Sequence, residues 1–415
     1  MGELTTKGAL AKKASKALAL MTAAEKNHAL EIMANSLLEH SIEILKANEQ
    51  DMAAAREKGM PQSFLDRLLL NEQRIKDMAD GLTALTALED PIGRVEEMWL
   101  NKDNLQIGKI IVPLGVVGMI YEARPNVTAD AAGLCLKSGN AVLLRGSSDA
   151  ICSNLVIVNC LAKAAEQAGM PEGSIQIVED TNRNTVDEML KLNQYLDVLI
   201  PRGGAGLIRR VVENATVPVI ETGVGNCHIY VDADADLEMA ADIVMNGKVQ
   251  RPGVCNATET LLVHNDIAEA FLPIMNEKLL AAGVELRCCP RSAQWAAASK
   301  TATEEDYATE FHDLVLAVKI VDSLEEAIEH ISTYSTKHSE VIVTNNYNHA
   351  RKFQQMIDAA VVYVNASSRF SDGFQFGFGA EIGISTQKIH ARGPMGLKAL
   401  TSYKYIVNGN GQVRK

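Results

Sequence analysis

The stretch Pro113-Leu114-Gly115-Val116-Val117-Gly118-Met119-Ile120-Tyr121 is a continuous apolar run. A helical pattern follows over residues 129–137, and a second apolar run, Ala141-Val142-Leu143-Leu144, comes next. Apolar runs as short as these are typical of strands in a parallel sheet, because helices cover both faces of such a sheet. The order of strand, helix and strand therefore predicts an α/β domain.

The same alternation extends outward from this stretch. It continues downstream to about residue 220, and a second alternation runs between residues 228 and 364. Upstream, residues 8–90 carry apolar side chains at spacings of three and four, which predicts a series of amphipathic helices. A length of 415 residues is too great for one ordinary core, and we expect two parallel-sheet α/β domains.

Composition and charge exclude several classes of partner. The net charge of −12 disfavours nucleic acid and anionic membranes, because a globally acidic surface does not attract them. No apolar run approaches the roughly 20 residues that span a bilayer, and the first residues lack the layout of a signal peptide. We therefore expect a cytoplasmic protein.

The seven cysteines agree with a reducing compartment. Their number is odd and no C-x-x-C is present, which favours free thiols over a disulfide framework. Cys288 and Cys289 are adjacent, but no second pair or histidine stands at zinc spacing. No metal site is predicted.

Cys255 is the candidate nucleophile. It follows Pro252-Gly253 and precedes the strand-like run Thr260–Val263. A turn of this kind lifts a thiol out of a packed core, because proline fixes one dihedral and glycine relaxes the next. The alternative is a buried cysteine that behaves as a small hydrophobe, and Cys255 alone does not decide between them.

Two strand ends are candidate phosphate sites. Arg202 is followed by Gly203, Gly204 and Gly206, a turn whose backbone amides can cradle a phosphate or simply cap a helix. Arg145 ends another strand and is followed by Gly146-Ser147-Ser148.

Glu221 ends a third buried strand. A carboxylate there is either a general base with a raised pKa or a cap that faces solvent.

The order of these elements, continued by Gln250, Cys255 and the pair Glu310-Phe311, resembles the aldehyde dehydrogenase superfamily over essentially the whole chain. Within it, three stretches resemble the acyl-phosphate reductases of proline biosynthesis: residues 121–128, residues 334–342, and residues 376–386 together with 391–397. The resemblance implies an aldehyde-dehydrogenase-like α/β fold with two parallel-sheet domains and a small β-hairpin arm.

The resemblance also implies a division of the chain. Residues 1–97 and 111–225 would form a cofactor-binding domain, and residues 226–390 a catalytic domain bearing Cys255. Residues 98–110 and 399–415 would form the arm, which mediates oligomerisation in the superfamily. We therefore expect a homo-oligomer.

The implied reaction is the NADPH-dependent reduction of L-glutamate 5-phosphate to L-glutamate 5-semialdehyde and phosphate, through a thioester on Cys255. The upstream partner would be a glutamate 5-kinase that hands over its unstable product. The alternative enzyme is a hydrolytic NAD(P)-dependent semialdehyde dehydrogenase, in which Glu221 activates water. A binding protein that kept only the fold is a third alternative. The joint presence of Cys255, Gln250, Glu221 and Glu310 argues against it.

The superfamily implies roles for particular residues in cofactor binding. Arg145, Ser148, the turn Gly203, Gly204 and Gly206, and Glu310 would bound the cofactor pocket, with Glu310 on a ribose. Members that prefer NAD commonly carry a carboxylate at the position of Ser148. Its absence beside Arg145 favours NADPH, whose 2′-phosphate a carboxylate would repel.

The catalytic groups are less completely matched. The backbone N–H of Cys255 would be one oxyanion donor, but the superfamily's asparagine falls on Ala123, which leaves Asn126 as a candidate. In a reductase, Glu221 would deprotonate Cys255, protonate the departing group or order the cleft.

The substrate's anionic groups need cations. Arg124, Arg369 and Arg392 are candidates, and surface salt bridges are the alternative role for each. His338 is expected to be a structural, hydrogen-bonding residue.

Overall fold

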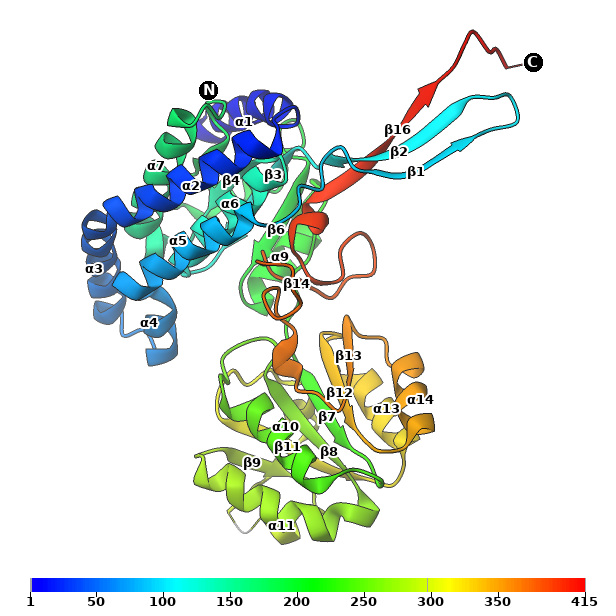
Figure 1. The fold of residues 1–415 in the computed structure, drawn as a ribbon. Coiled ribbons are helices and arrows are strands. Elements are labelled where there is room, and N and C mark those ends of the chain that lie inside the picture. The colour runs from blue at the N-terminus through cyan, green and yellow to red at the C-terminus, as the bar shows by residue number, and fades with distance from the viewer. Residues whose placement is uncertain (1, 297, 415) are drawn as a thin grey trace. The chain divides into compact units, whose positions relative to one another are not determined.

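The computed structural model describes residues 2–296 and 298–414. Its internal contacts divide the chain into two compact units. Unit 1 comprises Met1–Thr222, Gly377–Gly383 and Met395–Lys415. Unit 2 comprises Gly223–Phe376 and Ile384–Pro394. The chain therefore returns to unit 1 twice after leaving it (Figure 1).

The core of unit 1 is a four-stranded parallel sheet in the order β5-β4-β3-β6. All residues of β3 and β4 are buried, as expected for strands covered on both faces. The strands are β3 (Val116–Tyr121), β4 (Ala141–Arg145), β5 (Ile175–Ile177) and β6 (Val198–Arg202). The first two confirm the apolar runs from which the fold was predicted.

Helices surround this sheet (Figure 1). The predicted N-terminal series is confirmed as α1 (Glu3–Leu18), α2 (Ala23–Glu39), α3 (Ser41–Glu57), α4 (Gln62–Leu68) and α5 (Glu72–Thr86). The others are α6 (Pro125–Lys137), the short 3₁₀ helix η1 (Ser148–Ala150), α7 (Ile151–Gln167), α8 (Arg183–Met189) and α9 (Ala205–Asn214). α2 begins with a capping box, in which Thr22 and Glu25 satisfy each other's backbone N–H groups.

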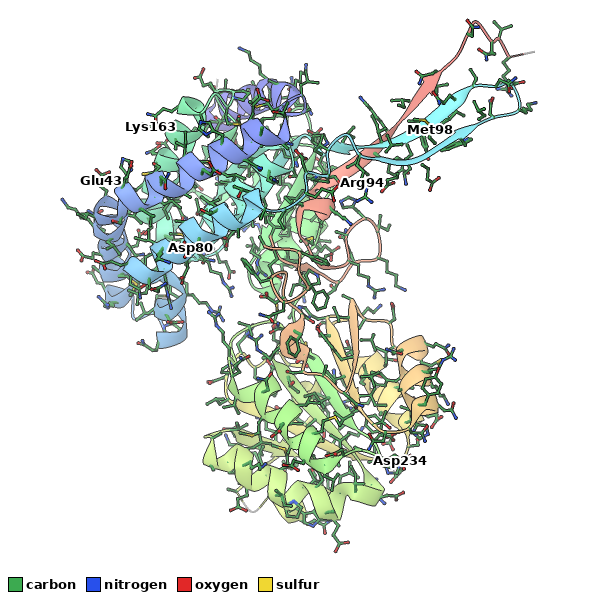
Figure 2. The ribbon with its side chains drawn as sticks, viewed as in Figure 1. Glu43, Asp80, Arg94, Met98, Lys163 and Asp234 are labelled. Carbon is green, nitrogen blue, oxygen red and sulfur yellow. The ribbon has the colours of Figure 1, made fainter. Side chains whose placement is uncertain are left out.

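A three-stranded antiparallel sheet extends from the helices of unit 1 as an arm. Its strands are β1 (Val95–Leu100), β2 (Gln106–Pro113) and β16 (Thr401–Asn408), which follows η4 (Leu397–Leu400). β2 is central and pairs with β16 along its whole length, from Thr401 opposite Pro113 to Asn408 opposite Gln106. Every side chain of β1 is exposed, and Figure 2 labels Met98 on this strand.

Unit 2 is built on a seven-stranded parallel sheet in the order β10-β9-β11-β8-β7-β12-β13. The strands are β7 (Cys227–Val231), β8 (Thr258–His264), β9 (Glu285–Cys288), β10 (Lys300–Thr301), β11 (Val315–Val321), β12 (Ser339–Val343) and β13 (Val361–Val364). The helices are α10 (Leu237–Val249), α11 (Asn265–Ala281), η2 (Ala293–Trp295), α12 (Glu304–Ala308), α13 (Leu324–Tyr334), α14 (Tyr347–Met356) and η3 (Ser368–Phe370). A two-stranded pair, β14 (Ile384–Ser385) and β15 (Gly393–Pro394), lies in the glycine-rich stretch of residues 377–396, whose composition is typical of a loop.

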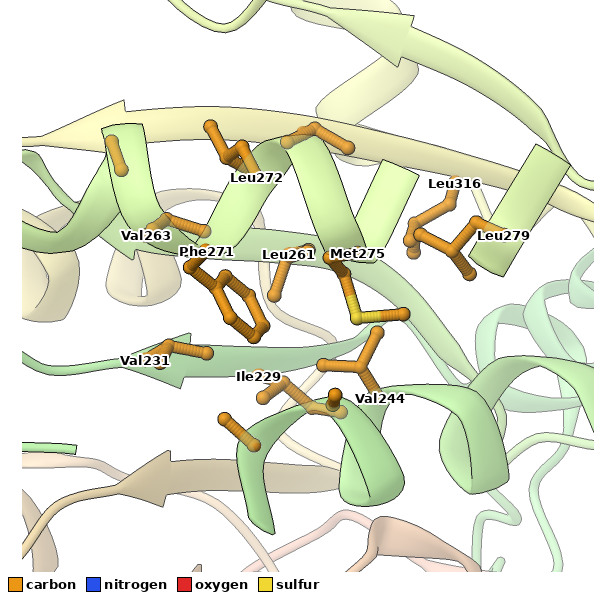
Figure 3. Close-up of a cluster of buried hydrophobic side chains, with 14 of the residues drawn as sticks. Ile229, Val231, Val244, Leu261, Val263, Phe271, Leu272, Met275, Leu279 and Leu316 are labelled. Atoms are coloured by element: carbon orange, nitrogen blue, oxygen red, sulfur yellow. The ribbon is translucent and has the colours of Figure 1, made fainter. Parts of the chain in front are cut away.

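One face of this sheet packs on α10 and α11. Figure 3 shows Phe271 and Met275 of α11 among the side chains of Ile229, Val231 and Leu261, which come from β7 and β8. The same buried cluster includes Val244 of α10 and Leu261 of β8, so it anchors both elements that flank the segment between them.

The α/β fold with parallel sheets was predicted correctly. Among the described helices, none combines the length and apolarity needed to cross a membrane. The predicted division into three parts stays a prediction. The two compact units do not separate the arm from unit 1, and the first boundary between them lies after Thr222.

Candidate active site

Cys255 lies in a turn between α10 and β8. α10 ends at Val249 and β8 begins at Thr258. The Ala257 N–H donates to the Val254 carbonyl at 3.0 Å, which closes the turn. The sequence predicted a turn here, and the thiol of Cys255 is half-buried in it.

The carbonyl of Cys255 lies against Gly225, just before β7, and Cys227, the first residue of β7. The Cys227 thiol donates to this carbonyl at 3.2 Å. A Cβ at Gly225 would lie 1.6 Å from the same oxygen, so a residue without a side chain is required there. Burial raises the pKa of the Cys227 thiol well above its usual value, so it remains a protonated donor.

Arg369 brings a cation to this turn. It lies in η3, and its Nε donates to Gln250 Oε1 at 3.0 Å. Burial lowers the pKa of Arg369, nearby Arg251 acts in the same direction, and Cys255 opposes the shift. A guanidinium keeps its charge under these conditions. The predicted anion binder is therefore close to the candidate nucleophile.

His338 belongs to the support of the turn. It is buried, its Nδ1 lies 3.7 Å from Cys227 Sγ, and the same nitrogen lies 3.0 Å from Ser339 Oγ. These contacts are those of a hydrogen-bonding histidine, and its structural role stays a prediction.

Glu310 presents one carboxylate oxygen that has no hydrogen-bond partner among the described residues. The side chain is 8% exposed, and its Oε2 lies 3.2 Å from His312 Nε2, whereas Oε1 is buried and unpartnered.

Lys248 and Glu259 form a fully buried ion pair of 2.5 Å near this segment, and Glu259 Oε1 accepts from the His312 N–H at 3.4 Å. Burial raises the pKa of Glu259 to about 7 against the effect of Lys248.

In unit 1 the predicted phosphate turn connects β6 to α9. Gly203 follows β6, Gly204 is the N-cap of α9, and Gly206 lies in its first turn with open space beside its Cα. A Cβ at Gly203 would lie 2.7 Å from the carboxyl carbon of Glu122. The amide end of α9 is thus exposed for an anion at Gly206, and the Glu122 carboxylate lies against Gly203, just before the helix.

Arg145 holds two loops of unit 1 together. Its Nη2 donates to the carbonyls of Thr181 at 2.8 Å and Asn182 at 3.2 Å, and its Nη1 donates to that of Gly146 at 3.1 Å. Burial lowers the pKa of Arg145. The guanidinium therefore holds the loop after β4, which leads to Ser148, against the loop that contains Thr181 and Asn182.

Ser148 is exposed at the start of η1. Its neighbour Asp149 pairs at 2.6 Å with Lys58, the C-cap residue that follows α3. Asp51 of α3 accepts from the Ser153 N–H at 2.8 Å and so caps the start of α7. α3 thus supports the turn that carries Ser148.

Asn126 and Arg124 lie at the start of α6. Arg124 is the N-cap residue, and Asn126 Nδ2 donates to Asp130 Oδ2 at 3.2 Å. Burial raises the pKa of Asp130 to about 7, Asn126 and Arg202 lower it, and Glu381 raises it.

The two remaining predicted residues are Glu221 and Arg392. Glu221 is half-buried near the end of the first segment of unit 1, before Thr222, whose hydroxyl donates to the Pro201 carbonyl at 2.6 Å. Arg392 of unit 2 pairs with Asp358 at 2.8 Å, and Lys388 shares that carboxylate.

Comparison with known proteins connects these groups to a family. The model of the aldehyde dehydrogenase family matches residues 5–287. A γ-glutamyl phosphate reductase of Heliobacterium modesticaldum is 63% identical over 99% of both chains. That of Caldanaerobacter subterraneus is 60% identical over the whole of both. The crystal structure of the Thermotoga maritima γ-glutamyl phosphate reductase superposes with a TM-score of 0.96 at 51% identity and full coverage.

The chain belongs to the γ-glutamyl phosphate reductases of the aldehyde dehydrogenase family. The predicted family, fold class and oxidoreductase class are therefore confirmed. An acetylating aldehyde dehydrogenase of Geobacillus thermoglucosidasius shares the fold at 19% identity, with a TM-score of 0.72. Membership of the reductases implies a nicotinamide cofactor and a small-molecule substrate.

The structure adds residues that the sequence reasoning missed. In unit 2 it brings Cys255, Gln250 and Arg369 together, and it shows that Cys227 binds the carbonyl of Cys255 and that Gly225 lies against it. The glycines after Glu221 were noted in the sequence, but their contact with Cys255 spans about thirty residues and left no local signal. The roles of the individual site residues of this reductase family member stay predictions.

Proposed function

We propose that this chain reduces L-glutamate 5-phosphate to L-glutamate 5-semialdehyde and phosphate, with NADPH, through a thioester on Cys255. The observation that carries the proposal is the full-length identity of 63% to a γ-glutamyl phosphate reductase. The half-buried thiol in its turn, with a guanidinium beside it, supplies a nucleophile of the required kind.

The chemistry begins with the Cys255 thiolate. It attacks the acyl carbon, the bond between that carbon and the phosphate oxygen breaks, and phosphate leaves with the electron pair. NADPH, when bound, supplies the hydride that reduces the resulting thioester. The carbon–sulfur bond then breaks and Cys255 leaves as a thiolate. A thioester suits this sequence because it accepts hydride more readily than an ester does.

Several features fit a dinucleotide. The unpartnered Glu310 Oε1 is a buried acceptor suited to a ribose hydroxyl. The N-terminus of α9 at Gly204 and Gly206 suits a phosphate. Ser148, exposed and uncharged, suits a 2′-phosphate, and Arg145 acts by holding the loops beside it. The choice of NADPH rests on Ser148.

The anionic groups of the substrate are assigned to arginines. Arg369 is the candidate with the closest link to Cys255. Arg124 is proposed for a second anionic group. Arg392 already shares Asp358 with Lys388, so its participation requires an exchange of partners.

Glu221 has three proposed roles: deprotonating Cys255, protonating the departing group, or ordering the site. The enzyme is proposed to act in the cytoplasm as a homo-oligomer joined through the arm. Delivery of substrate from a glutamate 5-kinase is part of the same proposal, because an acyl phosphate of glutamate is prone to cyclise.

The test follows the reverse reaction. Reduction of NADP is recorded with glutamate 5-semialdehyde, with and without inorganic phosphate, for the wild type and Cys255→Ala. The proposal expects turnover that requires phosphate and an inactive variant. Equal turnover without phosphate would identify water as the acceptor and the enzyme as a hydrolytic dehydrogenase.

A further inference from the structure

The dihedral angles of the Cys255 turn define its type. Cys255 and Asn256 are the central residues between Val254 and Ala257, which are joined by the hydrogen bond that closes the turn. Neither central residue has a positive φ. Types II, I′ and II′ each require a positive φ at a central position, so this is a type I turn.

A type I turn aims two backbone donors in one direction. Its central residues have near-helical dihedrals, so their N–H groups point to one side, as at the start of a helix, and the carbonyl between them points to the other. In this turn the donors are the N–H groups of Cys255 and Asn256. The Cys255 carbonyl is the acceptor for Cys227, which anchors it on the side away from those donors.

The N–H of Asn256 has no acceptor among the described residues. The Asn256 side chain is turned elsewhere, because its Nδ2 donates to the Ser371 carbonyl at 2.9 Å, and Ser368 Oγ donates to the Asn256 carbonyl at 2.7 Å. These contacts hold the Asn256 residue in place and leave its N–H available to a ligand.

We propose that the main-chain N–H of Asn256 is the second donor of the oxyanion hole, beside that of Cys255. The inference rests on the proposed function, since an oxyanion forms only when a carbonyl carbon is attacked by Cys255. The Asn256 N–H would take the place of the asparagine side-chain amide of the superfamily, whose position is occupied by Ala123 in this chain. Asn126, the other candidate, gives its amide to Asp130 within unit 1.

Cys227 is, in the same proposal, a positioning residue. Its thiol holds the carbonyl of the peptide whose N–H is the new donor, and Gly225 allows that peptide to approach β7. A displacement of about 1 Å at such a donor is enough to cost roughly 100-fold in rate.

The test compares two reactions of Cys255. p-Nitrophenyl acetate acylates a thiol through a tetrahedral oxyanion, whereas iodoacetamide alkylates it by a displacement that forms none. The ratio of the two rate constants, each corrected with Cys255→Ala, therefore reports the oxyanion hole. Neither reaction needs the cofactor or glutamate 5-phosphate.

The decisive variant carries the α-hydroxy acid analogue of asparagine at position 256, which replaces the N–H by an oxygen. We expect its acylation rate to fall about 100-fold, as for the loss of one oxyanion donor, with alkylation unchanged. An unchanged ratio would overturn the proposal. So would a ratio that falls for Asn126→Ala and not for the 256 analogue.

A second pair of variants tests the proposal if the analogue does not fold. Cys227→Ala is expected to lower the ratio about tenfold, and Cys227→Ser, which retains a donor, to restore most of it. Equal ratios in the wild type and both variants would contradict the positioning role. The proposed function alone would be overturned by a different pair of results. In that case the wild type turns over equally well without phosphate, but the ratio of acylation to alkylation still falls in the variants.

Discussion

Gly225 is a position at which the smallest added side chain should displace the candidate nucleophile, Cys255. A methyl group there would lie 1.6 Å from the Cys255 carbonyl oxygen, so the turn must move. We expect Gly225→Ala to lower turnover about 100-fold or more, as misplaced catalytic groups do. Steady-state kinetics of the phosphate-dependent reaction measure this.

The matched control is Gly81→Ala in α5. This glycine has a helical backbone and nothing within 4 Å of its added Cβ. We expect normal turnover and a gain of about 0.5–1 kcal/mol in the free energy of unfolding, because alanine favours the helix. Loss of activity in the control, or full activity in Gly225→Ala, would contradict the assignment of the close contact.

His330 should make unit 2 sensitive to acid. Burial lowers its pKa to about 2, and His228 and Lys319 act in the same direction. A depressed histidine pKa gives stability that is complete above the unfolded value near 6.5 and is lost as the pH falls below it. Between pH 7 and pH 5 the loss amounts to about 2 kcal/mol.

Urea unfolding of the wild type and His330→Gln at both pH values tests this. The variant should lose less stability on acidification, by about the same 2 kcal/mol. Parallel losses in the two proteins would show that His330 is not the titrating group.

Some residues of the candidate site could be identified from the sequence, and others could not. Cys255 was found because proline and glycine precede it and mark a turn locally. Cys227 and Gly225 were not, because their partner lies in another part of the chain. Arg145 was recognised as a cation at a strand end, but its hydrogen bonds to the Thr181 and Asn182 carbonyls depend on how loops pack.

At the scale of elements, α7 depends on a cap supplied by another helix. Asp51 of α3 accepts from the N–H groups of Cys152 at 3.2 Å and Ser153 at 2.8 Å, and from the Ser153 hydroxyl at 2.6 Å. We expect Asp51→Ala to cost about 2 kcal/mol or more in stability, since hydrogen bonds to a charged group are lost and buried donors are left unpaired.

Thermal unfolding is the measurement, and Asp77→Ala is the control. Asp77 is an exposed residue of α5 that accepts a hydrogen bond from Gln73, so its loss should stay within about 0.5 kcal/mol. Equal effects of the two substitutions would argue against a cap from α3. Weaker binding of NADPH, the proposed cofactor, by Asp51→Ala would further link α3 to the turn at Ser148.

Element type was predictable wherever one periodicity dominated. β3 and β4 were evident from uninterrupted apolar residues, and α1 to α5 from helical spacing. The pair β14 and β15 was missed because each strand has two residues within a glycine-rich segment. Such strands form when the surrounding chain brings them together, and a two-residue strand has no pattern of its own.

For the whole molecule, the arm is the expected contact between copies. Its exposed apolar side chains include Trp99, Leu100, Tyr405 and Val407, and an antiparallel sheet with open edges readily pairs with another chain. We expect Leu100→Lys combined with Val407→Lys to lower the mass measured by light scattering to that of a monomer.

Leu20→Lys provides the control for this change. Leu20 is also exposed but lies outside the arm, so its substitution should leave the oligomer intact. A double variant that keeps the wild-type mass would show that the arm does not join the copies. The arm was expected from family resemblance, whereas the pairing of β16 along the whole of β2 required the structure.

The pairing of β16 with β2 also sets an order of events on the ribosome. Asn408 meets Gln106, which was synthesised 302 residues earlier. At about 5–20 residues per second, the nascent hairpin of β1 and β2 waits about 15–60 s for its third strand. Both segments of unit 2 emerge during that interval. Closure of the arm is therefore a late step of biosynthesis. The strands of the other sheets are synthesised before β16, so those sheets can form before the arm is ready to join another copy.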